Sequence, residues 1–213
     1  MASEVTYADK DQPRHPFGLP AGSVRAVLAV MIVSLLWLIV LLPENKNNAV
    51  PFIPIPLFLY FLLLPIALFF FAHGRTIAVN SPSPWGLPRG TFRVLIVLIS
   101  AGAVGLHYYF YGIGPWAHFQ PQAAELAAWR KLLVAMAIGL VLGRLIGQGP
   151  WRNSAAFQDI QAWVSLIGML GLGVETILHL LVNPQLGEDL KMDLSMLEAV
   201  LTGIVAWYFA ARS

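Results

Sequence analysis

The sequence predicts an all-α integral membrane protein with six transmembrane helices, and three observations lead to this fold class. Of its 213 residues, 58% are hydrophobic and only 11% are charged, whereas soluble domains carry about 25% charged residues. Six stretches are close to the roughly 20 apolar residues that a helix needs to cross a bilayer. Prolines lie between these stretches, where helices commonly end.

The predicted helices occupy residues 23–213, after a polar cytoplasmic arm at residues 1–22. The arm has no early apolar run of the kind found in cleavable signal peptides, so the first helix is predicted to be an uncleaved anchor. The second stretch is rich in phenylalanine and uncharged throughout, which favours a helix that faces lipid. The predicted spans are Ser23–Leu42, Phe52–His73, Thr91–Tyr111, Ala128–Arg144, Asp159–Val182 and Leu194–Ala211.

The distribution of Lys and Arg predicts the orientation. With the N-terminus inside, nine of these residues lie on the cytoplasmic side and four outside, as the positive-inside rule requires. We therefore expect a multi-pass protein of a bacterial inner (plasma) membrane with both termini in the cytoplasm. The net charge of +2 is small and spread thinly, which argues against a nucleic-acid partner. The expected partners are the lipid bilayer, other membrane subunits or a second copy of the chain.

The chain contains an internal repeat. Residues 18–25 read GLPAGSVR, and residues 86–93 read GLPRGTFR, a shift of 68 positions. Two spans per repeat keep every copy in the same orientation, so the sequence predicts tandem parallel hairpins at about 23–75 and 91–144. A third hairpin at about 159–212 is possible, with Asp159 at the position of Thr91.

The repeated motif allows two interpretations. Ser23 and Thr91 are predicted to cap their helices, and Arg25 and Arg93 can extend to lipid phosphates. In the simpler interpretation these four residues are a clamp that fixes where the helix enters the membrane. In the other, the two helix N-termini form a site for an anion or a lipid headgroup.

Five ionisable residues lie within or near the predicted spans, and such residues are candidates for function. A rise of 1.5 Å per residue puts Glu175 and His107 about 24 Å above the inner face, and Glu198 and Arg130 about 21 Å above it. All would then share one layer of the outer leaflet. Glu175 and His179 are four residues apart and share a helix face.

Three interpretations of this polar cluster stay open. In the first, the cluster is purely structural: Arg130 or a histidine pairs with Glu175 or Glu198 and holds the helices together. A proton or cation site would use the same carboxylates beside a histidine. A metal site could form from Glu175, His179 and Glu198, but E-x3-H alone is a weak pattern, so the sequence assigns no metal and no cofactor.

Gly139, Gly143 and Gly147 recur at four-residue spacing in the fourth span. Small residues in this register let helix backbones approach closely. The contact could lie within one chain or between two protomers. Further glycines in the third and fifth spans predict that spans three to five form the packed interior.

No catalytic motif is present, and the absence of cysteine excludes thiol nucleophiles and disulfides. We therefore expect a non-enzymatic integral membrane subunit, a scaffold or assembly component of a larger membrane complex. The alternative is a small proton- or ion-coupled transporter or channel that uses the outer-leaflet cluster of carboxylates and histidines.

Overall fold

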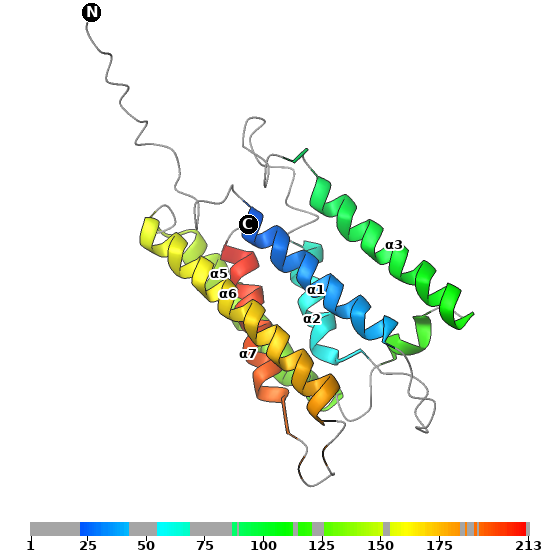
Figure 1. Ribbon diagram of the computed structural model, residues 1–213. Helices are drawn as coiled ribbons and strands as arrows, with labels where there is room; N and C mark the ends of the chain where they lie inside the picture. The colour runs from blue at the N-terminus through cyan, green and yellow to red at the C-terminus, as the bar shows by residue number, and fades with distance from the viewer. Residues whose placement is uncertain are drawn as a thin grey trace, which may run out of the picture.

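The computed structural model is all-helical over the part of the chain that it describes. The described residues are 22–42, 55–68, 87–88, 90–112, 115–120, 126–150, 154–183, 186, 190 and 192–211. They contain six α-helices (Figure 1), a short 3-10 helix and π-helical turns at residues 66–68 and 178–182. Residues 1–21 of the predicted N-terminal arm, residues 43–54 and 69–75 of the first predicted hairpin, and residues 212–213 lie outside the described residues.

Each predicted span overlaps one α-helix, and most boundaries agree within a few residues. The α-helices are α1 (Ser23–Leu41), α2 (Leu57–Pro65), α3 (Thr91–Tyr111), α5 (Trp129–Gly147), α6 (Ala155–Ile177) and α7 (Ser195–Ala211). The 3-10 helix is η4 (Pro115–Phe119), and the π-helical turn η6 (Leu178–Val182) continues α6. Three helices, α1, α3 and α6, are long and apolar enough to cross a membrane.

The start of α6 corrects one prediction. The helix begins at Ala155, and the Ser154 side chain accepts a hydrogen bond from the backbone N–H of Phe157. Asp159 therefore lies inside the first turns of α6 and is not its N-cap. The alignment of Asp159 with Thr91, on which a third copy of the repeat partly depended, does not hold at this point.

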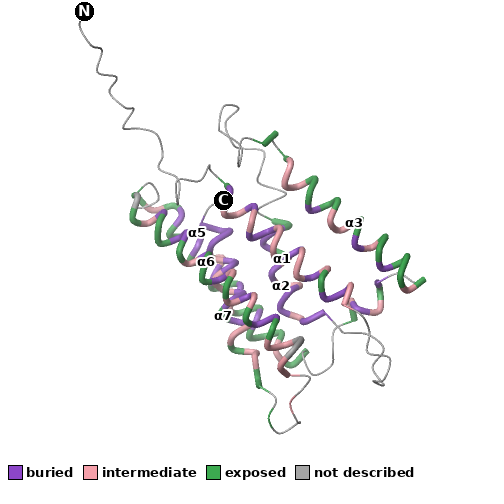
Figure 2. The backbone as a smooth tube through the Cα atoms, in the orientation of Figure 1, coloured by how far each residue is buried: buried purple, intermediate pink, exposed green. Residues whose placement is uncertain are grey.

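The core is built mainly by α1, α2 and α7 (Figure 2). Ile32, Leu59 and Phe209 are completely buried there, one from each helix. The prediction that the second span faces lipid is wrong for the described part of α2, because Phe58, Leu59 and Leu62 are at most 1% exposed. A helix that is apolar on every side suits a protein core as well as it suits lipid.

Helices α5 and α7 lie side by side and run parallel, in direct contact at three glycines. A methyl group added at Gly139 would overlap the carbonyl oxygen of Gly203, and one at Gly143 would overlap that of Trp207. At Gly147 it would lie 2.8 Å from the carbonyl oxygen of Ala211. The glycines thus bring the two backbones together within one chain, the close approach that small residues allow.

Helix α3 lies at the periphery and packs along α1 (Figure 1). The indole N–H of Trp37 donates to the hydroxyl of Ser100 at 2.9 Å, and the Tyr111 hydroxyl donates to the carbonyl of Leu42 at 3.3 Å. These contacts make α1 and α3 parallel. The prediction that spans three to five form the interior is wrong for α3, where Gly102 and Gly105 have nothing within 4 Å of an added methyl group.

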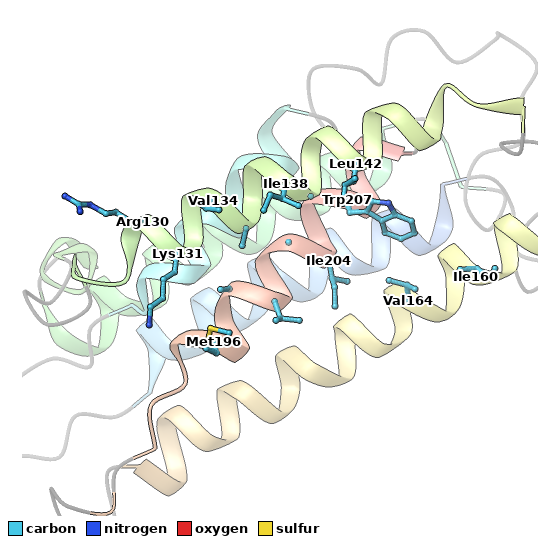
Figure 3. A pocket seen from close by; sticks show the side chains of 15 residues that line it. Arg130, Lys131, Val134, Ile138, Leu142, Ile160, Val164, Met196, Ile204 and Trp207 are labelled. Carbon is cyan, nitrogen blue, oxygen red and sulfur yellow. The ribbon is translucent and has the colours of Figure 1, made fainter.

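An apolar groove of about 880 Å³ opens between α5, α6 and α7 (Figure 3). Val134, Ile138, Ile160 and Trp207 are among the side chains that line it, and Arg130 and Lys131 lie at one end. Its lining includes none of Glu175, His179 and Glu198. The groove and the polar cluster are therefore separate features of the described residues.

Candidate functional site

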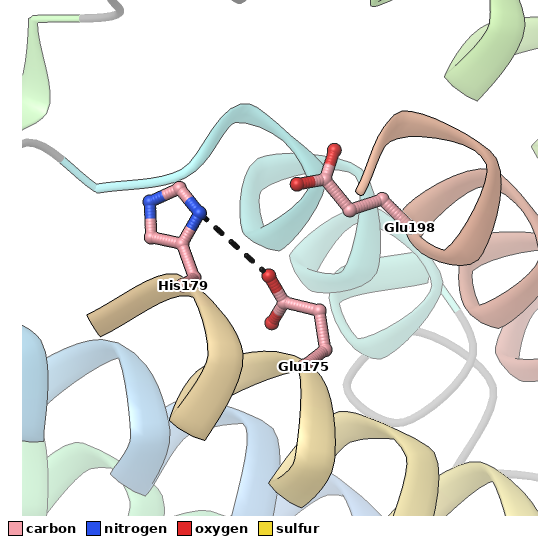
Figure 4. A group of neighbouring side chains, drawn as sticks. All are labelled: Glu175, His179 and Glu198. Atoms are coloured by element: carbon pink, nitrogen blue, oxygen red, sulfur yellow. Dashed lines mark ion pairs between the residues drawn. The ribbon is translucent and has the colours of Figure 1, made fainter. Parts of the chain in front are cut away.

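Three ionisable side chains meet where α6 gives way to η6 and where α7 begins (Figure 4). Glu175 comes from the end of α6, His179 from η6 and Glu198 from the first turn of α7. One ligand atom from each side chain lies within 4.8 Å of the other two. The Nδ1 atom of His179 is 4.0 Å from Oε1 of Glu175, which makes an ion pair when the imidazole is protonated.

The three side chains differ in how far they are buried. Glu175 is 1% exposed, Glu198 is partly buried, and the His179 side chain is 25% exposed. A carboxylate removed from water is costly unless positive charge or hydrogen bonds compensate it. The arrangement therefore places a deep acidic group behind a histidine that solvent or a small ion can reach.

The local backbone explains why these groups converge. The hydroxyl of Thr176 donates to the carbonyl of Leu172 at 2.8 Å, within α6. The helix then changes to π geometry at residues 178–182, which include His179. Single π turns inside α-helices are rare and occur frequently at functional sites. Because the π turn changes the angular spacing of side chains, it sets the direction in which the imidazole projects.

A second contact holds the start of α7 beside the end of η6. The Asn183 side chain donates to the backbone carbonyl of Met192 and accepts from its N–H, both at 3.1 Å. This paired bond closes the connection between the two helices. The carboxylate of Asp193 then accepts the Ser195 N–H at 2.9 Å, which positions the first turn of α7 and with it Glu198.

Asp193 also has a perturbed acidity. The hydrogen bond from the Ser195 backbone holds the pKa of Asp193 below its usual value of 3.8, helped by the Ser195 side chain and by the positive charge of Lys131. The Lys131 ammonium donates to the Ser195 hydroxyl at 3.0 Å. The start of α5 thus meets the start of α7, as the parallel packing of these two helices requires.

Arg130 and His107 do not join the cluster. Arg130 is exposed, and its guanidinium lies 5.7 Å from the ring centre of the neighbouring Trp129. Counting residues along the predicted spans gave these residues the same depth as Glu175 and Glu198. Depth does not determine which way a helical side chain points. The four groups predicted to share one layer therefore lie in three separate places, with Glu175 and Glu198 together and Arg130 and His107 each elsewhere.

His107 instead forms a second polar pair, with His118 of η4. Both imidazoles are buried, at 0% and 1% exposure, and their Nε2 atoms are 3.2 Å apart. The backbone carbonyl of His118 also accepts the N–H of Ile55, just before α2. The pair thus ties η4 to α3 while η4 holds the start of α2. Sequence reasoning missed His118 because it lies in a connector with no helical periodicity.

The two copies of the motif share one backbone conformation at the glycine just before each helix, but the caps differ from the prediction. Gly22 and Gly90 are the N-caps, with φ of 83° and 86°, a left-handed conformation that favours glycine. Ser23 and Thr91 each occupy the first helical position, and the Thr91 hydroxyl donates back to the Pro88 carbonyl at 2.6 Å. Ser23 is buried, whereas Arg25 and Arg93 are partly exposed at the helix starts. The prediction that Ser23 and Thr91 act as N-caps is therefore wrong.

No protein-family model matches this sequence, and comparisons with curated proteins and with solved structures find no match.

Proposed function

We propose that the chain is a non-enzymatic integral membrane subunit, a helical scaffold that holds a partner's transmembrane helix through α3. The observation that carries this proposal is the unequal packing of α3. Over its most apolar stretch only 17% of residues are buried, compared with 50% for α1 and 39% for α6. Its outer side presents Leu98, Gly102, Gly105 and Tyr109 at helical spacing, all exposed.

The chemistry of this face suits a helix better than an aqueous ligand. Gly102 and Gly105 leave a shallow strip where another backbone can come close, the arrangement used between membrane helices. Large apolar side chains flank the strip, with Leu98 62% exposed and Tyr109 81% exposed. We propose that a partner helix of similar apolar character packs along this strip.

The proposed setting is a bacterial inner membrane, crossed six times, with both termini in the cytoplasm. The bias of nine cytoplasmic to four outer Lys and Arg residues supports this orientation. The parallel packing of α1 with α3 and of α5 with α7 also supports it, because tandem two-span repeats make alternate helices parallel. The matching Gly22 and Gly90 conformations support a repeat of two copies.

The test is retention of partners in native membranes. The chain would be isolated in mild detergent with an affinity tag, and the co-purifying membrane proteins would be identified by mass spectrometry. Gly102→Leu with Gly105→Leu should remove at least one stoichiometric partner and leave the subunit folded, since neither position has a neighbour within 4 Å of an added methyl group. Ile167→Phe, at a 58% exposed position on α6, is the matched control.

Two outcomes would overturn the proposal. One is a wild-type chain that retains no partner and forms no crosslink in native membranes. The other is a partner that the double leucine variant retains as well as the control does.

A second candidate function is proton- or ion-coupled transport. The observation in its favour is the convergence of Glu175, His179 and Glu198 from two helices. Reconstitution into liposomes with a pH-sensitive dye would discriminate between the candidates. A flux that Glu175→Gln and Glu198→Gln both abolish would establish transport, and an unchanged background flux would leave the scaffold as the better account.

A further inference from the structure

Two carboxylates and an imidazole on adjacent helices form a ligand set of mixed chemistry at the junction of α6, η6 and α7. The three ligand atoms lie within 4.8 Å of one another. In a tetrahedral site with metal–ligand bonds of about 2.0–2.2 Å, ligand atoms are about 3.3–3.6 Å apart. The ligand atoms therefore need to approach one another by at most about 1.5 Å to share one ion.

The side chains have room to make this adjustment. Glu198 lies in the first turn of α7 and is partly exposed, and the His179 side chain is 25% exposed. Glu175, at 1% exposure, is the fixed member of the set. Figure 4 shows the imidazole of His179 and the two carboxylates gathered in one place, so the two outer side chains need only turn toward Glu175 to share an ion.

The charges of the three groups also match a divalent cation. Two ionised carboxylates carry two negative charges, and an imidazole binds a metal in its neutral form. A divalent ion bound among them gives a neutral site, whereas a protonated His179 can balance only one of the two carboxylates. Neutrality matters here because charge buried beside an apolar core is costly.

The ligand types narrow the identity of the ion. Calcium and magnesium prefer sites made entirely of oxygen, while an imidazole favours first-row transition metals such as zinc. Three protein ligands leave a fourth position open for water or another donor. His179 lies in a π-helical turn, a feature that occurs frequently at functional sites.

We propose that Glu175, His179 and Glu198 bind one divalent transition-metal cation, with Zn²⁺ as the probe, and that the ion fastens the end of α6 to the start of α7. This proposal goes beyond the scaffold function, which depends on α3. The ion joins two segments that the Asn183–Met192 bonds already hold together. Its binding is therefore expected to stabilise the α6–α7 pair.

The test is a zinc titration of the full-length, metal-stripped protein in mild detergent. The purification tag contains no histidine, so that it does not bind zinc itself. We expect one Zn²⁺ per chain by calorimetry and elemental analysis, with an increase in the thermal unfolding temperature. Glu175→Gln, His179→Gln and Glu198→Gln should each weaken binding at least ten-fold. Mg²⁺ in large excess should not compete.

His118→Gln is the matched control, because it alters a buried histidine pair elsewhere in the chain and should leave zinc affinity unchanged. Since Glu198 and His179 are partly exposed, their glutamine variants should remain folded even if Glu175→Gln does not. Absence of zinc binding to the wild type would overturn the proposal. So would zinc binding that survives both the His179 and Glu198 substitutions, or that is lost with His118→Gln.

Discussion

Substitution of Gly139 by alanine should destabilise the α5–α7 pair, although alanine is the better helix former. The added methyl carbon would overlap the carbonyl oxygen of Gly203 and lie 3.1 Å from the Cβ of Ala206. Overpacking of this kind costs about 1–3 kcal/mol. The gain in helix propensity returns about 1 kcal/mol, so the expected net loss is up to about 2 kcal/mol.

Gly102→Ala is the matched control, because it makes the same chemical change in α3, where nothing lies within 4 Å of the new methyl group. It should be neutral or stabilising by up to about 1 kcal/mol. The free energy of unfolding would be measured for both variants by titration with SDS in mixed micelles. Equal stability of the Gly139 and Gly102 variants would refute the close packing of α5 against α7.

The remaining predictions concern three polar contacts. His118→Ala removes the buried contact with His107, which should lower the free energy of unfolding by about 1–3 kcal/mol. Hydrogen exchange at the Ile55 amide, which donates to the His118 carbonyl, should accelerate. An unchanged rate would show that the histidine pair does not hold η4. Asn183→Ala removes both bonds to Met192 and should accelerate exchange at the Met192 amide, whereas Gln148→Ala, at an exposed position after α5, should not. Because the folded state lowers the pKa of Asp193, its contribution to stability is present above the ordinary value of 3.8 and is lost as pH falls through the lowered pKa. Protection of the Ser195 amide, measured as its exchange rate relative to an unstructured amide at the same pH, should therefore fall in acid in the wild type, and it should already be low at neutral pH in Asp193→Ala.

The positions of the helices were predictable because apolar length and proline placement are local properties of the sequence. The boundaries of α1, α3 and α7 agree with prediction within one residue at each end. The burial of α2 was not predictable in this way, since its phenylalanines and leucines satisfy lipid and core alike. Which of the two surrounds a helix depends on its neighbours, and hydropathy does not contain that information.

The candidate site was predictable only in part. The Glu175–His179 pair follows from a four-residue spacing on one helix, and Glu198 follows from a short connection between adjacent spans. Arg130 was assigned to the same layer by depth alone, and its helical phase turns it away. His118 lies in a segment without a periodic pattern, so nothing in the sequence marked it. The left-handed N-caps at Gly22 and Gly90 were not predicted, because serine and threonine, which follow them, are themselves favoured at N-caps.

The most direct test of the account is a labelling experiment that determines on which side of the membrane the helix ends lie. The chain has no cysteine, so single cysteines at Gln148, after α5, and at Met192, before α7, can be labelled with an impermeant maleimide in intact spheroplasts. A scaffold that crosses six times, with both termini in the cytoplasm, requires Met192→Cys to react from outside and Gln148→Cys to react only after the membrane is opened. Labelling of both positions from the same side, or of neither after lysis, would contradict it.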